Sequence, residues 1–144
     1  MNDTTGIERL PRGVRLVRAL QKEPDWSAMT GPELITYRER ANRVAGSRLL
    51  RVVTGFPDRR AKIRWQEIAL ADRVLPVRVY RPAAALDPGT PLPLVLHVHG
   101  GGFVGTAAQC DWASSHLAAQ LPAVVMSVEH RLLAPGTPLP AAVA

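Results

Sequence analysis

The stretch Leu94-Val-Leu-His-Val-His-Gly-Gly-Gly-Phe103 decides the fold. Its first six residues form an almost continuously apolar run, which is typical of a central strand covered on both faces. Three glycines follow at once, and they let the backbone turn sharply with no side chain in the way. The stretch therefore predicts a buried strand that ends in a loop of accessible backbone N–H groups.

The sequence after this loop predicts a helix over 107–121 and a second buried strand over 123–128. The order strand, loop, helix, strand is a βαβ unit, so the expected class is α/β with a mostly parallel central sheet and helices on both faces. Before it, two strand-like runs over 63–70 and 74–80 are separated by a short polar turn and predict a hairpin. We expect about four strands in all.

Two helices are expected ahead of these strands. The first covers Arg9 to Lys22. The second is predicted to begin at Thr30, with Glu33 as its capping-box partner, and to end before Gly55. Its apolar stripe consists of Leu34, Tyr37, Ala41, Val44, Leu49 and Val53.

The net charge of +6 is unevenly distributed. Residues 1–81 hold 17 Lys and Arg against 9 Asp and Glu, a net of +8, while residues 82–144 carry a net of −2. The basic residues are scattered and do not form blocks, so we expect solvated helix faces and no nucleic-acid partner. A membrane surface or an acidic partner is the alternative. The sequence gives no basis for an oligomeric state.

Several features bear on the location of the chain. No apolar run approaches the roughly 20 residues that a membrane-spanning helix requires. The first residues are polar and lack a secretory pattern. The single cysteine, Cys110, excludes an internal disulfide. We therefore expect a cytoplasmic protein.

The glycine loop fits two chemistries. One is dinucleotide binding, because Gly100, Gly102 and Gly105 match Gly-x-Gly-x-x-Gly after a strand, and Glu129 closes the next strand where a ribose-binding carboxylate would lie. The other is an oxyanion hole, because His99 to Phe103 resembles the His-Gly-Gly-Gly motif of lipases and esterases.

Sequence outside the loop favours the second chemistry. Residues 77–82, Val-Arg-Val-Tyr-Arg-Pro, and the block His130-Arg-Leu-Leu-Ala-Pro-Gly-Thr-Pro-Leu-Pro-Ala-Ala142 are similar to segments of the hormone-sensitive-lipase branch of the α/β-hydrolases. The resemblance runs from about Trp65 to the end of the chain. Within it, His130 replaces the usual Tyr, Leu133 is an extra residue and Gly136 replaces the usual Glu.

This resemblance implies a partial α/β-hydrolase fold and a serine carboxylesterase or lipase that acts on small-molecule esters through an acyl-enzyme. It assigns Gly101 and Gly102 as oxyanion donors and His99 as an organiser of the loop. It implies no cofactor and no metal. The expected domains are cap-like helices over 1–60 and the first part of the hydrolase domain over 61–144.

The nucleophile motif Gly-x-Ser-x-Gly does not occur in the sequence. In this fold the Ser, Asp or Glu, and His of the triad all follow the oxyanion loop, so we expect a truncated and inactive chain. A non-catalytic product, alone or with a partner that carries the rest, is the alternative.

Other candidate groups have simpler interpretations. His97 and His99 share a strand face, but no third metal ligand is nearby. Glu129 and His130 are expected to point to opposite faces and so not to form a dyad. Cys110 is expected to be packed, and Asp111 either braces the glycine loop or is solvated.

Overall fold

The computed structural model describes residues 24–26, 28–83 and 90–135, and the chain divides into two compact units, residues 1–30 and 31–144. In the first unit the N–H of Ala28 donates to the carbonyl of Asp25 at 3.2 Å. The second unit holds every described helix and strand. The helix expected over Arg9 to Lys22 and the end of the proline-rich block, 136–144, lie outside the described residues. The expected domain boundary at residue 60 stays a prediction.

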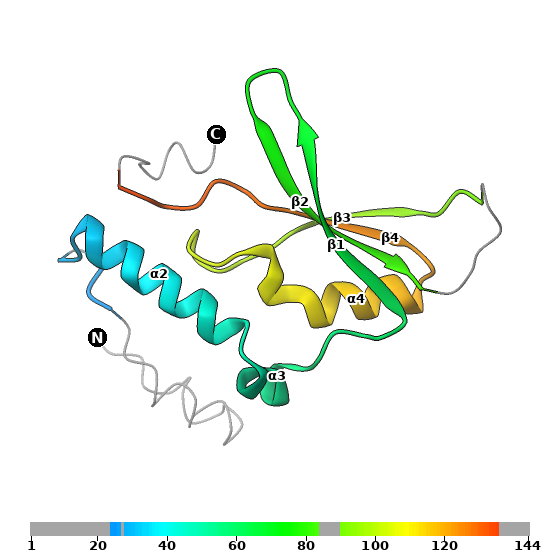
Figure 1. Cartoon of the computed structure of the whole chain (residues 1–144), viewed down its shortest axis with the longest axis horizontal. Helices are drawn as coiled ribbons and strands as arrows, with labels where there is room; N and C mark the ends of the chain where they lie inside the picture. Colours follow the sequence, from blue (N-terminus) through cyan, green and yellow to red (C-terminus); the bar gives the residue numbers. More distant parts are fainter. Residues whose placement is uncertain (1–23, 27, 84–89, 136–144) are drawn as a thin grey trace, which may run out of the picture. The chain divides into compact units, whose positions relative to one another are not determined.

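The described strands form one sheet in the order β1-β2-β4-β3 (Figure 1). β1 (Ala61–Ala69) and β2 (Val74–Pro82) pair antiparallel, which confirms the predicted hairpin. β3 (Leu94–Val98) and β4 (Val124–Val128) pair in parallel, and β4 also pairs antiparallel with β2. The α/β class and the expected sheet of about four strands are therefore confirmed.

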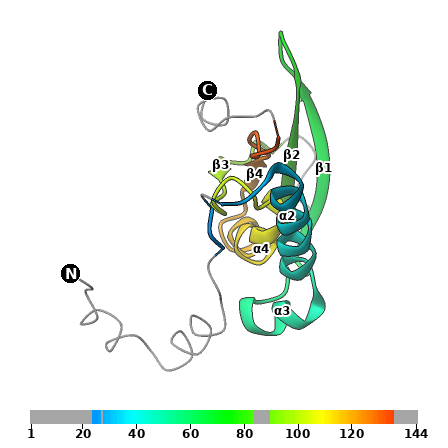
Figure 2. The same ribbon diagram turned by 90° about the vertical axis from the view of Figure 1, so that its left-hand side faces the viewer.

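The connection between the parallel strands consists of the short 3-10 helix η2 (Ala107–Cys110) and α4 (Asp111–Gln120). α4 packs against one face of the sheet (Figure 2). On that face Ala118 of α4 is buried together with Tyr80 of β2 and Val125 of β4. This burial closes the βαβ unit that the sequence predicts.

The opposite face of the sheet is only partly buried. Val77, Val79 and Val124 form a small cluster there. On β3, however, the side chains that share this face (Leu94, Leu96 and Val98) are 62%, 64% and 68% exposed. The apolar run predicts a strand covered on both faces, but β3 lies at the edge of the sheet, and no helix among the described residues lies over this side of it.

The prediction of a single helix between Thr30 and Gly55 is wrong, because two helices occupy this segment. α2 (Gly31–Ala45) ends before Gly46, and α3 (Arg48–Thr54) begins after Ser47. Ser47 has an extended backbone, and its hydroxyl accepts the N–H of Leu50 at 3.2 Å, so it acts as a helix cap within the apolar stripe. None of the helices in the described ranges is long and apolar enough to cross a membrane.

A buried ionic cluster joins α4 to the hairpin. Arg78 donates two hydrogen bonds to the carboxylate of Asp111, at 2.6 and 2.8 Å, and the hydroxyl of Tyr80 donates a third at 2.9 Å. Burial lowers the pKa of Arg78, but the hydrogen bonds and the charge of Asp111 outweigh it, so the pKa lies above its usual value. Burial, with the charge of Asp111, also raises the pKa of Tyr80. Asp111 therefore links α4 to the hairpin; it is not solvated, and its partners in the described ranges do not include the glycine loop.

We expect Asp111→Ala to lower the free energy of unfolding by about 3 kcal/mol, because it leaves the Arg78 cation and the Tyr80 hydroxyl without their partner. Urea unfolding followed by circular dichroism measures this change. Glu67→Ala, which removes an exposed carboxylate from β1, is the matched control and should leave the midpoint nearly unchanged. Equal losses in the two variants would contradict this role for Asp111.

Candidate active site

The glycine loop begins directly after β3 and turns through three successive residues of positive φ. The φ angles are +120° at Gly101, +60° at Gly102 and +59° at Phe103. The turn is closed by the N–H groups of Val104 and Gly105, which both donate to the carbonyl of Gly101 at 3.1 Å. Phe103 is the unusual member, because residues with a side chain rarely adopt this conformation.

The space around the loop differs from one glycine to the next. A Cβ atom at Gly101 would lie 2.6 Å from Nε2 of Gln109 and 3.1 Å from Cα of Gly105, so a side chain here would displace Gln109 and strain the backbone at φ +120°. A Cβ at Gly102 would have nothing within 4 Å. Both glycines are exposed, and within the described ranges neither N–H donates a hydrogen bond. The loop therefore presents two adjacent free donors.

The peptide unit between Gly100 and Gly101 is held by two side chains. Nδ1–H of the buried His99 donates to the carbonyl of Gly100 at 2.8 Å, and Nε2 of Gln109 donates to the same oxygen at 2.6 Å. His99 thus lies where the sequence predicts a loop organiser. The sequence gives no signal for Gln109, since an amide in a helical segment is ordinarily solvated.

Glu129 follows β4 and contacts residues on both sides of the glycine loop, Ala107 and His99. One carboxylate oxygen accepts the N–H of Ala107 at 3.0 Å, and the other lies 3.6 Å from Nε2 of His99. These last two atoms are buried and have no other hydrogen-bond partner.

Glu129 and His130 do not behave as alternating strand residues, contrary to expectation. The ring of His130 stacks on that of His99, with centroids 4.3 Å apart, and Phe103 meets it edge-on at 5.5 Å. Glu129 contacts His99 as well. The alternation fails because β4 ends at Val128, so both residues follow the strand and converge on one imidazole.

The far side of the loop is attached to α2. The side chain of Asn42 donates to the carbonyl of Val104 at 2.8 Å and accepts the N–H of Thr106 at 3.1 Å. The N–H of Leu133 donates to the carbonyl of Phe103 at 2.8 Å, and Arg38 donates to the carbonyl of Leu133 at 3.0 Å. The extra residue Leu133 therefore lies against the glycine loop, and α2 holds both segments.

The remaining candidate groups lie outside this arrangement. Nδ1 of His97 is 2.9 Å from the hydroxyl of Ser127, and burial, with repulsion from His99, lowers the pKa of His97. Burial raises the pKa of the Cys110 thiol. Among the described residues, no group of three His, Cys, Asp or Glu side chains could hold a metal ion.

Free N–H donors at the end of a strand in a βαβ unit are able to bind an anion or an oxyanion. Comparisons with known proteins indicate which fold this unit resembles. Residues 95–144 match the model of a family described as having the alpha/beta hydrolase fold. A 3-O-acetylpapaveroxine carboxylesterase of Papaver somniferum is 38% identical over 78 residues, which is 49% of this chain and 24% of that protein.

Solved structures of esterases agree with the same assignment. An esterase of Pyrobaculum calidifontis superimposes with a TM-score of 0.67 and 31% identity, over 93% of this chain and 39% of its own. The carboxylesterase EstE1, cloned from a metagenomic library, gives a TM-score of 0.59 and 32% identity, over 81% and 36%. The chain is therefore similar to esterases of the α/β-hydrolase fold, and it spans about two-fifths or less of the length of the three relatives named here.

We expect Asn42→Ala to loosen the glycine loop while leaving α2 intact, because alanine is a better helix former and the loop loses both hydrogen bonds to the amide. The bond lost by the N–H of Thr106 is worth about 1 kcal/mol, so amide hydrogen exchange at Thr106 should accelerate about fivefold. Exchange measured by NMR tests this. Arg43→Ala, an exposed change on the same helix, is the control, and unchanged exchange at the loop in Asn42→Ala would show that α2 does not brace it.

Proposed function

We propose that this chain carries the oxyanion-hole loop of a carboxylic ester hydrolase. The observation that supports it is the pair of free, exposed N–H groups on Gly101 and Gly102 at the carboxyl end of a parallel strand. When a nucleophile attacks an ester carbonyl, negative charge develops on its oxygen. Donors fixed in place beforehand stabilise that charge by roughly 2.7–4 kcal/mol each.

The direction of each donor follows from the planarity of the peptide bond. In a trans peptide unit the carbonyl and the following N–H point in opposite directions. His99 and Gln109 fix the carbonyl of Gly100, and this fixes the N–H of Gly101. The two N–H groups that bind the carbonyl of Gly101 fix the N–H of Gly102 in the same way.

The proposed reaction is ester hydrolysis through a serine acyl-enzyme, with a small-molecule ester as substrate and no cofactor. None of the five serines of the sequence lies in a Gly-x-Ser-x-Gly motif. The loop would therefore act together with a nucleophile, and with the rest of a triad, that residues 1–144 do not contain. A cytoplasmic location remains a prediction.

The dinucleotide alternative has less support. A ribose-binding carboxylate must be free to accept hydrogen bonds from the ligand, whereas Glu129 already accepts the N–H of Ala107 and faces His99. Gly105 packs against the side chain of Gln109 beneath the loop. The match of residues 95–144 to a family with the alpha/beta hydrolase fold also favours the hydrolase over a nucleotide-binding protein.

We expect the chain by itself to hydrolyse p-nitrophenyl acetate no faster than an inert protein of equal concentration. Two oxyanion donors without a nucleophile provide only part of the catalytic apparatus. Spectrophotometric detection of nitrophenolate measures the rate. Turnover that disappears in Gly101→Val, or covalent labelling by a fluorophosphonate, would show that the chain carries a nucleophile of its own.

The donors themselves are tested in a chimaera of residues 1–144 with the part of the Pyrobaculum calidifontis esterase that follows its matched segment. Gly101→Ala should lower kcat about 100-fold, because alanine is strained at φ +120° and its Cβ displaces Gln109, which holds the Gly100 carbonyl and thereby the donor. Gly100→Ala, whose Cβ would meet nothing within 4 Å, is the matched control and should retain most of the activity. A folded chimaera without activity, or equal losses in the two variants, would contradict the assignment.

A further inference from the structure

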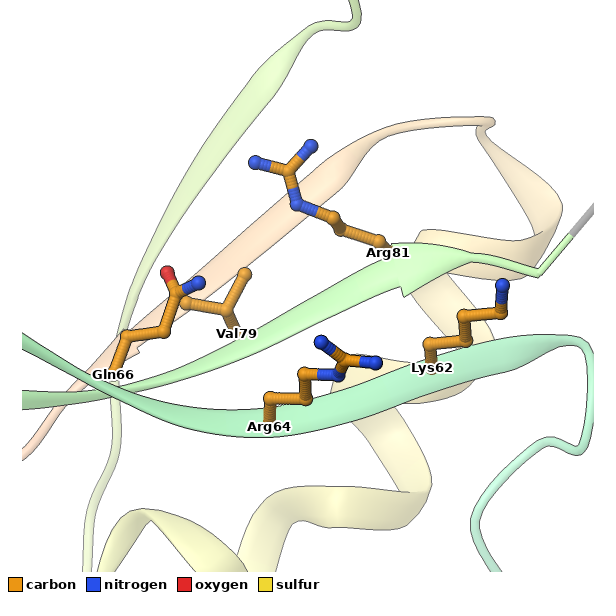
Figure 3. A pocket seen from close by; sticks show the side chains of 5 residues that line it. All are labelled: Lys62, Arg64, Gln66, Val79 and Arg81. Atoms are coloured by element: carbon orange, nitrogen blue, oxygen red, sulfur yellow. The ribbon is translucent and has the colours of Figure 1, made fainter. Parts of the chain in front are cut away.

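The β1–β2 hairpin has a second polar face, on the side of the sheet opposite α4. Arg78 and Tyr80 reach Asp111 of α4, so the side chains that alternate with them in β2, Val79 and Arg81, point the other way. Figure 3 shows Lys62, Arg64 and Gln66 of β1 on this same face. The cross-strand register places Lys62 opposite Arg81 and Arg64 opposite Val79.

These five side chains line a hollow of about 230 Å³. Val79, only 3% exposed, contributes an apolar surface to it, and the cationic side chains of Lys62, Arg64 and Arg81 are exposed. The volume is below the range of about 300–1,000 Å³ that is typical of drug-sized ligands. The hollow therefore suits a small ligand or a single ligand group.

Within the part of the chain that the structure describes, no acidic side chain neutralises the charge in this hollow. Other cations of the hairpin and of the segment before β1 form ion pairs: Arg78 with Asp111, and Arg60 with Asp58. Among the residues that the structure describes, no carboxylate pairs with Lys62, Arg64 or Arg81. Like charges directly opposite each other on antiparallel strands are destabilising, and this is the relation of Lys62 to Arg81.

We propose that Lys62, Arg64 and Arg81 form a binding site for a phosphate group. A phosphate monoester carries close to two negative charges at neutral pH and three acceptor oxygens. Two guanidinium groups can each bind it through paired N–H donors, the lysine adds a third cation, and the amide of Gln66 adds a neutral donor. A single carboxylate would neutralise only one of the three cations, so the dianion is the better match.

This site is independent of the proposed hydrolase function. It lies on the hairpin, on the opposite sheet face from Arg78 and Asp111, and it includes no residue of the glycine loop. Its test is equilibrium binding to the chain itself and needs no turnover. Failure of either proposal therefore leaves the other unaffected.

The experiment titrates the chain with pyrophosphate at low ionic strength in a calorimeter. We expect one saturable site per chain and about tenfold weaker binding, or more, in Arg64→Gln and in Arg81→Gln, since each removes charge-assisted hydrogen bonds. Arg73→Gln, which removes an exposed arginine from the turn of the same hairpin, is the matched control and should bind like the parent chain. All three side chains are exposed, and circular dichroism verifies that the variants are folded.

The phosphate could belong to a soluble compound or to a lipid headgroup, and a second arm separates these sources. The chain is sedimented with phosphatidylcholine vesicles that contain phosphatidic acid. If the chain sediments with the vesicles, if pyrophosphate prevents this, and if Arg64→Gln no longer sediments, the ligand is a lipid headgroup. If the chain binds pyrophosphate but does not sediment, the ligand is a soluble phosphate. Absence of saturable pyrophosphate binding, equal binding by Arg64→Gln and Arg73→Gln, or vesicle binding that Arg64→Gln does not change would each overturn the proposal.

Discussion

The planarity of two peptide units is the constraint on which the candidate site depends. The carbonyl groups of Gly100 and Gly101 are held from within the protein, so the N–H groups of Gly101 and Gly102 are directed away from these contacts. The geometry requires positive φ angles at both glycines and at Phe103. The Phe103 conformation costs of order 1 kcal/mol, which the hydrogen bonds of its neighbours must offset.

The supports of this turn come from segments that are distant in sequence. Asn42 belongs to α2, Gln109 to η2, and Glu129 follows β4. A loop with so many accessible backbone groups would sample many conformations if only its own residues held it. α2 therefore helps to hold the glycine loop in its conformation, as the βαβ unit does, although it precedes the strands in the sequence.

The sequence was sufficient for the local structure and for the motif, because periodicity and glycine chemistry are local signals. The hairpin, the βαβ unit and the position of His99 follow from them. The partners of the loop do not, because Asn42 lies 62 residues from Val104 and nothing in a helical stripe marks one amide as a brace. Ser47 is different: a serine after a glycine inside the apolar stripe was a readable cap signal, and attention to it would have divided the predicted helix in two.

The two faces of the hairpin show why charge patterning alone could not locate a binding site. Arg78 and Arg81 lie in the same strand and the same basic half of the chain, but they have opposite surroundings. Arg78 is partly buried under α4, where an unpaired cation would be costly, so it requires Asp111. Arg81 is exposed, so water can solvate it with no partner at all. An exposed cation on such a face indicates a binding site only when the strand register brings other cations next to it. Here the register places Arg81 opposite Lys62, and both line one hollow together with Arg64.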